Sequence, residues 1–224
     1  MKTYADIKHL QSQLPAAITL LERAYLLACR RNGPVHHCVQ ETVDMLIQHL
    51  ITNGDLSRAE DHCRRNLKNL QDPRYEYNPE GCAIIWSIQA LAEIWLRRDP
   101  GPDDEAAFAM AEEAEEMTRK SFKMIVSHYG RNSKEMGVYY RNLGDILLKR
   151  KKYTEDTCKV LELSVILTIQ FMGIEDTQLL RPYKRLAHYH DCLSVIKPPG
   201  DSRNYEVAMR EKYVESARQI EERK

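Results

Sequence analysis

Apolar side chains recur along most of the chain with the three- and four-residue spacing of one helix face. Two such runs are Ile84, Ile88, Leu91, Trp95 and Tyr183, Leu186, Ala187, His190. The strict alternation of apolar and polar residues that marks a half-buried strand is nearly absent. Turn-forming residues such as Gly33-Pro34 and Lys197–Gly200 separate the apolar runs. The pattern predicts about nine helices joined by short loops, and therefore an all-α chain.

Three of the predicted helices end in a glycine that is preceded, nine and sixteen positions earlier, by small residues. These sets are Ala17, Ala24 and Gly33; Ala114, Ser121 and Gly130; and Thr157, Ser164 and Gly173. A leucine and a small residue follow thirteen and fourteen positions after the last two glycines, at Leu143-Gly144 and Leu186-Ala187. Short side chains at a fixed spacing allow two helix backbones to approach closely. The recurrence therefore predicts repeated helical hairpins.

We expect these hairpins to form a single repeat domain over residues 1–224. The approximate units are 7–33, 36–71, 79–130, 133–173 and 177–224. A proline-rich insertion at Asp99–Asp104 lengthens the third unit, and Asp103 or Asp104 is expected to cap the helix after it. Tyr205, Tyr213 and Val214 are expected to dock the last helix on the preceding hairpin.

Residues 130–173 resemble a tetratricopeptide (TPR) repeat of the long type found in kinesin light chains. They carry a Leu-Gly pair, Tyr153 at the turn and a second helix that ends in glycine. Residues 36–96 resemble the C-terminal helical region of the MYND–SET lysine methyltransferases, which is itself TPR-like. The resemblance implies a right-handed superhelix of about four antiparallel hairpins with a concave binding face. The chain lacks the paired cysteines of a MYND finger and the cofactor loop of a SET domain. The resemblance therefore implies a helical scaffold without a zinc finger and without methyltransferase activity.

Charge and cysteine content argue against a nucleic-acid-binding, a membrane or a secreted protein. Thirty-three basic residues balance 33 acidic ones, so no global field attracts nucleic acid or a membrane surface. No apolar run approaches the length of a membrane span. The six cysteines form no C-x-x-C pair, and the first ten residues do not read as a secretory signal. We therefore expect reduced thiols in a cytoplasmic protein, with the nucleus as the other possibility.

The clusters of chemically active residues do not predict an enzyme, a metal or a cofactor. His36, His37 and Cys38 are adjacent and cannot all reach one ion. His190 falls on an apolar stripe, which favours a core histidine hydrogen-bonded to a neighbour. The acidic stretch 103–116 is interleaved with alanines and is expected to be a solvated helix face.

A polar face of two predicted helices is the candidate binding site. In TPR arrays the first helices of successive hairpins line the concave groove. Their polar residues here are Asn142, Asp145 and Lys149 on one helix, with Arg141 beside them, and Arg181, Lys184, Arg185 and His188 on the other. Such a patch could accept a carboxylate, a phosphate or an acidic peptide. The alternative is that these cations only solubilise exposed helices.

The sequence therefore predicts a non-catalytic scaffold that binds a peptide or helical segment of another protein. One alternative is the C-terminal region of a MYND–SET methyltransferase, present without its catalytic domain. Another is a structural bridging subunit with apolar contacts such as Met172 or Ile196. The oligomeric state is open.

Overall fold

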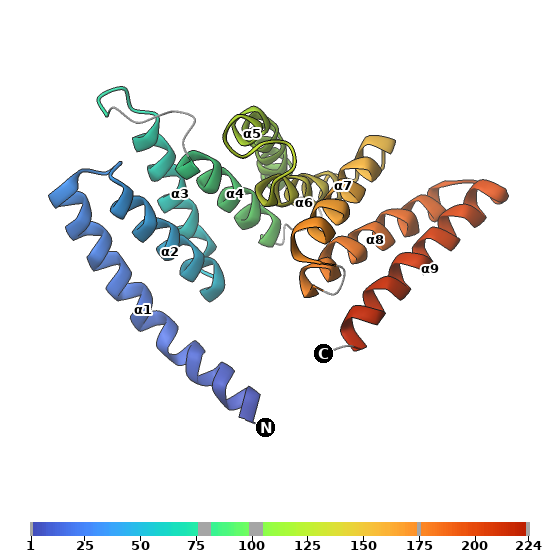
Figure 1. Cartoon of the computed structure of the whole chain (residues 1–224), viewed down its shortest axis with the longest axis horizontal. Helices are drawn as coiled ribbons and strands as arrows, with labels where there is room; N and C mark the ends of the chain where they lie inside the picture. Colours follow the sequence, from blue (N-terminus) through green and yellow to red (C-terminus); the bar gives the residue numbers. More distant parts are fainter. Residues whose placement is uncertain (1, 76–81, 99–104, 174–175, 223–224) are drawn as a thin grey trace. The chain divides into compact units, whose positions relative to one another are not determined.

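The computed structural model describes residues 2–75, 82–98, 105–173 and 176–222 (Figure 1). Within these ranges the chain forms nine α-helices and one short 3-10 helix, and it contains no strand. The prediction of an all-α chain is confirmed. The helices group into two compact units, Met1–Asp99 and Pro100–Lys224. The prediction of one repeat domain over the whole chain stays a prediction.

The first unit contains α1 (Lys2–Asn32), α2 (His37–Asn53), α3 (Leu56–Leu70) and α4 (Cys82–Arg97). Each helix packs against the next, and α4 also packs against α2. A buried polar contact joins three of them, because the Asn66 side-chain amide donates to Gln40 Oε1 at 2.8 Å and to Ser87 Oγ at 3.1 Å. Buried amides need such partners, so this contact fixes how α2, α3 and α4 meet.

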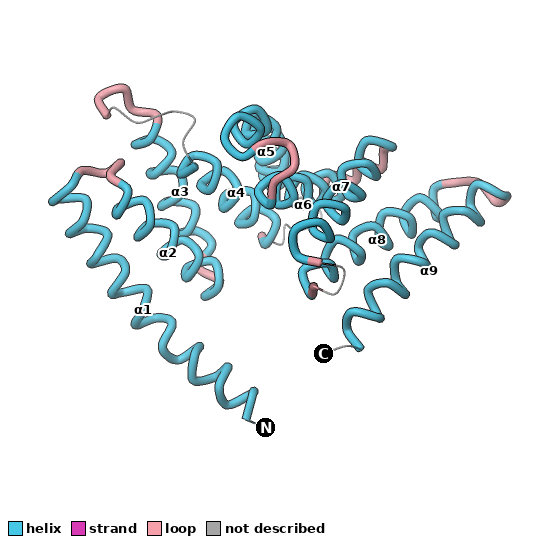
Figure 2. The backbone as a smooth tube through the Cα atoms, viewed as in Figure 1, coloured by secondary structure: helices cyan, strands magenta, loops and turns pink. Residues whose placement is uncertain are grey.

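The second unit contains α5 (Glu105–Tyr129), α6 (Lys134–Lys149), α7 (Glu155–Met172), the 3-10 helix η1 (Thr177–Leu179), α8 (Leu180–Ile196) and α9 (Asp201–Glu222). Helices α6 and α7 form one hairpin, and α8 and α9 form another (Figure 2). Helix α5 packs against α6, and α8 packs against both α6 and α7. The predicted unit 79–130 contains α4 and α5, which belong to different compact units. The insertion at 99–104, with its predicted caps, lies outside the described residues.

The predicted small residues of the second unit are buried where its helices pack together. Ala114 and Ser121 of α5 are buried, and so are Thr157 and Ser164 of α7. Gly144 of α6 lies so close to α7 that a Cβ atom there would come within 2.5 Å of the Leu161 side chain. The proposed role of small residues in close helix packing is therefore confirmed for these helices.

Two expectations about the terminal helices are wrong. Ala24 of α1 is exposed, because the packed face of α1 is the one that carries Ile18 and Tyr25, whose ring lies edge-on to His62 of α3. Of the three predicted docking residues of α9, Tyr213 alone is buried in the core, where its ring stacks on Tyr183. Tyr205 and Val214 of α9 face solvent. Helical spacing alone does not show how many sides of a terminal helix find a partner.

Candidate functional site

The candidate site is built where α8 packs against α6. Asp145 of α6 is buried, with 1% of its side chain exposed, and it binds two arginines of α8. Arg181 donates to Asp145 Oδ2 from Nε at 2.8 Å and also from Nη2. Arg185 Nε lies 2.8 Å from Asp145 Oδ1. A four-residue spacing places both arginines on one face of α8, which is why one carboxylate can hold both.

The electrostatics of this cluster leave it positively charged. Burial of a carboxylate is unfavourable unless cations compensate it, and Asp145 has two. The side chains of Arg181 and Arg185 remain 41% and 45% exposed. Their planar groups are therefore held in place by Asp145 and still face solvent, where they can bind a second carboxylate or a phosphate.

The other predicted site residues are distributed differently. Lys184 reaches the last helix, where its Nζ lies 2.7 Å from Glu221 Oε1. His188 is exposed, with its Nε2 3.7 Å from Cys192 Sγ. Asn142 is buried and therefore cannot belong to a solvent-facing patch. Arg141 is half-buried and Lys149 is exposed. The structure thus brings Arg181 and Arg185 together, and it directs Lys184 toward α9.

The sequence pattern places Asp145 on the polar face of α6, but it does not predict that Asp145 holds both arginines. It lies on the same polar face of α6 as Lys149, and it precedes Arg181 by 36 residues. The 43-residue spacing of the repeats places Asp145 in the hairpin before the arginine pair, so an acid on the preceding first helix is the signal that could have identified its role. Only the packing of α8 on α6 shows that the three groups meet.

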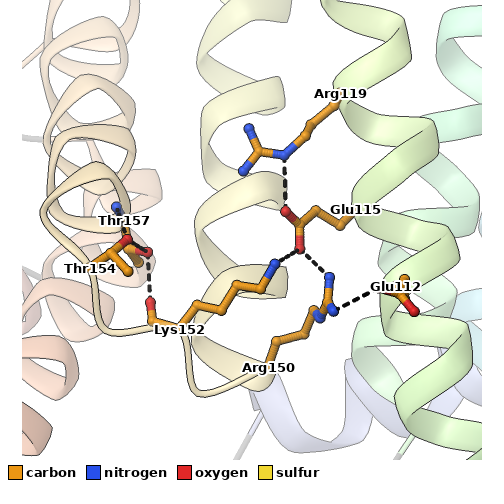
Figure 3. Close-up of polar contacts among 7 residues, drawn as sticks. All are labelled: Glu112, Glu115, Arg119, Arg150, Lys152, Thr154 and Thr157. Atoms are coloured by element: carbon orange, nitrogen blue, oxygen red, sulfur yellow. Dashed lines mark hydrogen bonds and ion pairs between the residues drawn. The ribbon is translucent and has the colours of Figure 1, made fainter.

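A second charged cluster lies where α5 meets the turn between α6 and α7 (Figure 3). Glu115 is buried and accepts hydrogen bonds from Arg119 Nε at 2.9 Å, from Lys152 Nζ at 2.8 Å and from Arg150. Burial alone would raise its pKa, but these three donors outweigh burial and lower the pKa of Glu115 to about 2. The expectation of a solvated acidic face is therefore wrong at Glu115, although Glu112 and Glu116 of the same stretch are exposed. The cluster fastens the turn to α5.

A third polar group ties α8 to α9. His190 is buried and its Nδ1 lies 2.5 Å from Glu206 Oε2, while Lys197 Nζ lies 2.5 Å from the other oxygen of Glu206. The imidazole also stacks on the Tyr213 ring. Burial opposes ionisation of Glu206, but the bonds from His190 and Lys197 prevail and lower its pKa. The prediction of a core histidine bonded to a neighbour is confirmed.

The remaining histidine and cysteine cluster is part of a helix cap. His36 caps α2, and its Nδ1 lies 3.1 Å from Cys38 Sγ. No group of three His, Cys, Asp or Glu side chains suited to a metal ion occurs among the described residues. None of the helices in the described ranges combines the length and apolar character of a membrane span.

The arrangement of helices can be compared with known proteins. No protein-family model matches the chain, and no curated protein sequence matches it. Solved structures do match. A crystal structure of nearly identical TPR-like repeats from a kinesin light chain of Podosopora anserina, in a variant form, covers 97% of this chain and 91% of that chain, with a TM-score of 0.65 and 14% identity. The fold is that of TPR-like repeats.

Two further structures agree with this assignment. A second crystal structure of the Podosopora anserina repeats gives a TM-score of 0.63 at 14% identity and covers 98% of this chain and 92% of that chain. BtubC (BKLC) from P. vanneervenii gives a TM-score of 0.55 at 16% identity, over 95% of this chain and 91% of that chain. The predicted resemblance to kinesin light chain repeats is confirmed for the fold. The resemblance to MYND–SET proteins stays a prediction.

Proposed function

We propose that the chain is a non-catalytic scaffold that binds a segment of another protein through the α6–α8 face. TPR-like hairpins cannot bury their faces alone, and stacking them leaves an extended surface for peptide or helix recognition. The carrying observation is that buried Asp145 fixes Arg181 and Arg185 while both guanidinium groups face solvent. Preorganised cations lose little side-chain entropy when they bind a ligand.

The chemistry of this face defines the ligand that we propose. Arg181 and Arg185 share one carboxylate, and Lys149 adds a further exposed cation on α6. A peptide with a carboxylate or phosphate at the arginine pair would complete its hydrogen bonds. We therefore propose an acidic peptide segment as the ligand.

An array of synthetic peptides of graded charge tests this proposal. We expect the peptides that bind to be acidic and their binding to weaken as salt rises. Neutralising Arg181→Gln, Lys184→Gln and Arg185→Gln together should weaken binding at least tenfold. A matched control variant with Lys120→Gln, Lys159→Gln and Arg218→Gln changes exposed cations elsewhere and should bind normally. Equal binding by both variants, with intact helicity by circular dichroism, would contradict the proposal.

The cysteines support a reducing compartment for this scaffold. All six are free thiols, although Cys63 is buried and the other five are partly exposed. Chains that function in oxidising compartments more often use such residues in disulfides. We therefore propose a cytoplasmic location, with the nucleus as the other possibility.

A bridging role in a larger assembly is the second candidate function. Val195 and Ile196 are strongly exposed at the end of α8, whereas Met172 is half-buried. Large apolar side chains that cluster at the surface favour contacts with other chains. This role would use a surface other than the arginine pair.

A further inference from the structure

The α8–α9 hairpin carries an open groove of about 630 Å³ on its surface. It is lined by Ala187, His188 and Asp191 from α8 and by Arg210, Glu211, Val214 and Glu215 from α9. Val214 is apolar and yet 52% exposed. The lining combines apolar groups with three carboxylates and a single arginine, Arg210, which pairs with Asp191 and Glu211. Arg218 beside the groove pairs with Glu215, so the carboxylates exceed the arginines by one. The groove therefore offers an apolar contact within an acidic rim.

The repeats themselves indicate what kind of element fits this groove. Helix α8 packs on both helices of the α6–α7 hairpin, and α4 packs on both α2 and α3. Ala187 and His188 stand 43 residues after Gly144 and Asp145, and Asp145 is the residue of α6 that binds α8. The groove thus lies at the position where a further helix packs on each earlier hairpin.

Helix α1 presents a face with the complementary properties. Leu20 and Leu27 are two helical turns apart and are each 66% exposed, and the exposed Ala24 lies between them. Arg23, Arg30 and Arg31 are exposed beside this stripe. The opposite face of α1 is the one that packs against α2. This outward face therefore combines apolar side chains with a basic rim.

We propose that the outward face of α1 in one copy of the chain docks in the α8–α9 groove of a second copy. Leu20 and Leu27 would cover Val214 and Ala187, and the arginines of α1 would pair with the carboxylates of the rim. Each copy carries one α1 face and one groove, so the contact is heterologous and joins copies head to tail. The proposal uses neither Arg181 nor Arg185, and so it is independent of the proposed peptide site.

Sedimentation velocity of the full chain over a range of concentrations tests the proposal. We expect self-association that weakens with salt. Charge reversal of the groove by Glu211→Lys with Glu215→Lys should raise the dissociation constant at least tenfold, and so should reversal of α1 by Arg23→Glu with Arg30→Glu. A mixture of the two reversed proteins should associate again, because each supplies the charge that the other needs. This rescue would not follow from misfolding of either variant.

Two controls accompany the measurement. Reversal of the exposed Glu116 and Glu155 to lysine should leave self-association unchanged, as should the neutralised variant of Arg181, Lys184 and Arg185. A chain that is monomeric at every concentration would overturn the proposal. So would self-association that neither pair of reversals weakens, or a mixture of the reversed proteins that stays monomeric. A monomeric chain that binds a different basic helix in the groove would also overturn the second copy as its occupant.

Discussion

The α2–α3 and α6–α7 hairpins turn the chain in the same way with different residues. A left-handed residue follows the first helix in both, with φ 82° at Gly54, directly after α2, and φ 54° at Lys151, the second residue after α6. The next amide then donates to the fifth carbonyl back, from Asp55 to Leu50 and from Lys152 to Leu147, at 2.9 Å in each turn. Glycine adopts this conformation without strain, whereas lysine does not. The two hairpins therefore share the backbone conformation at the end of the first helix, although residues 54–55 form the first connection and residues 150–154 form the second.

The two hairpins also differ in which helix supplies the large side chain at their contact, a difference that we call the exchange of bulk. The same alignment places Ile47 of α2 at the position of Gly144 in α6. In the second helices, the buried set Ala59, Cys63 and Asn66 has the spacing of Thr157, Leu161 and Ser164. With this spacing, which is shifted by one residue from the alignment of the first helices, Cys63 corresponds to Leu161, and the Leu161 side chain occupies the space that Gly144 leaves. We infer that the large side chain comes from α2 in one hairpin and from α7 in the other, at similar total volume.

The two hairpins also differ in whether a carboxylate removed from solvent has cationic partners. Three cations surround Glu115 at the α6–α7 turn, whereas burial alone raises the pKa of Asp44 on α2 to about 6. A charge with partners favours the folded state, and a buried charge without them opposes it. The two sites should therefore respond to pH in opposite directions.

The largest effect is expected from filling the space at Gly144. Gly144→Ile should lower the free energy of unfolding by about 3 kcal/mol, because the new side chain collides with Leu161. Adding Leu161→Cys reproduces the pair found in the first unit and should recover at least half of the loss. Urea denaturation followed by circular dichroism measures both. A double variant no more stable than Gly144→Ile would refute the exchange of bulk.

Glu115→Gln should lower the free energy of unfolding by about 2 kcal/mol at neutral pH, because it removes one charge from a compensated cluster. The folded-state pKa of Glu115 is about 2, below its unfolded value. Its contribution is thus complete above about pH 4.5 and is lost as the pH falls toward 2. Denaturation at several pH values measures this difference. Glu116→Gln, at an exposed neighbour that pairs with Lys120, is the matched control and should change stability little.

Asp44→Asn should raise the free energy of unfolding by about 1 kcal/mol at pH 8. The folded-state pKa of Asp44 is raised to about 6, so its contribution to stability falls as the pH rises from about 4 to about 6. The amide removes the unfavourable charge, and the gain should therefore vanish below about pH 4. A gain that is the same at pH 4 and pH 8 would show that ionisation of Asp44 is not its cause.

The smallest effect is expected at the turns. Lys151→Gly should raise stability by about 0.5–1 kcal/mol, because it relieves a left-handed lysine. Gly54→Lys should lower stability by about 1 kcal/mol for the same reason. Thermal denaturation of the two variants measures these opposite shifts. Shifts of the same sign would mean that side-chain contacts, rather than backbone conformation, control the turns.

Much of the fold could be predicted because its signals are local. The apolar spacing of Ile84, Ile88 and Leu91 lies within one helix and predicts a buried face that the structure contains. The glycines at 130 and 173 mark helix ends in the same way, since left-handed backbone there favours glycine. The candidate site was less predictable. Its polar residues, Asp145 among them, were found, but the pairing of Asp145 with Arg181 and Arg185 was not.

The sequence by itself determined the helices, their ends and the small residues that allow α5 and α7 to pack closely. The physical reason is that helical periodicity and capping depend on residues only three to five positions apart. Tertiary structure alone decided that Glu115 is buried among cations, that Asp145 holds two arginines and that Ala24 faces solvent. Such contacts join helices that are about one repeat apart, so they depend on how the helices pack and not on the pattern within any one of them.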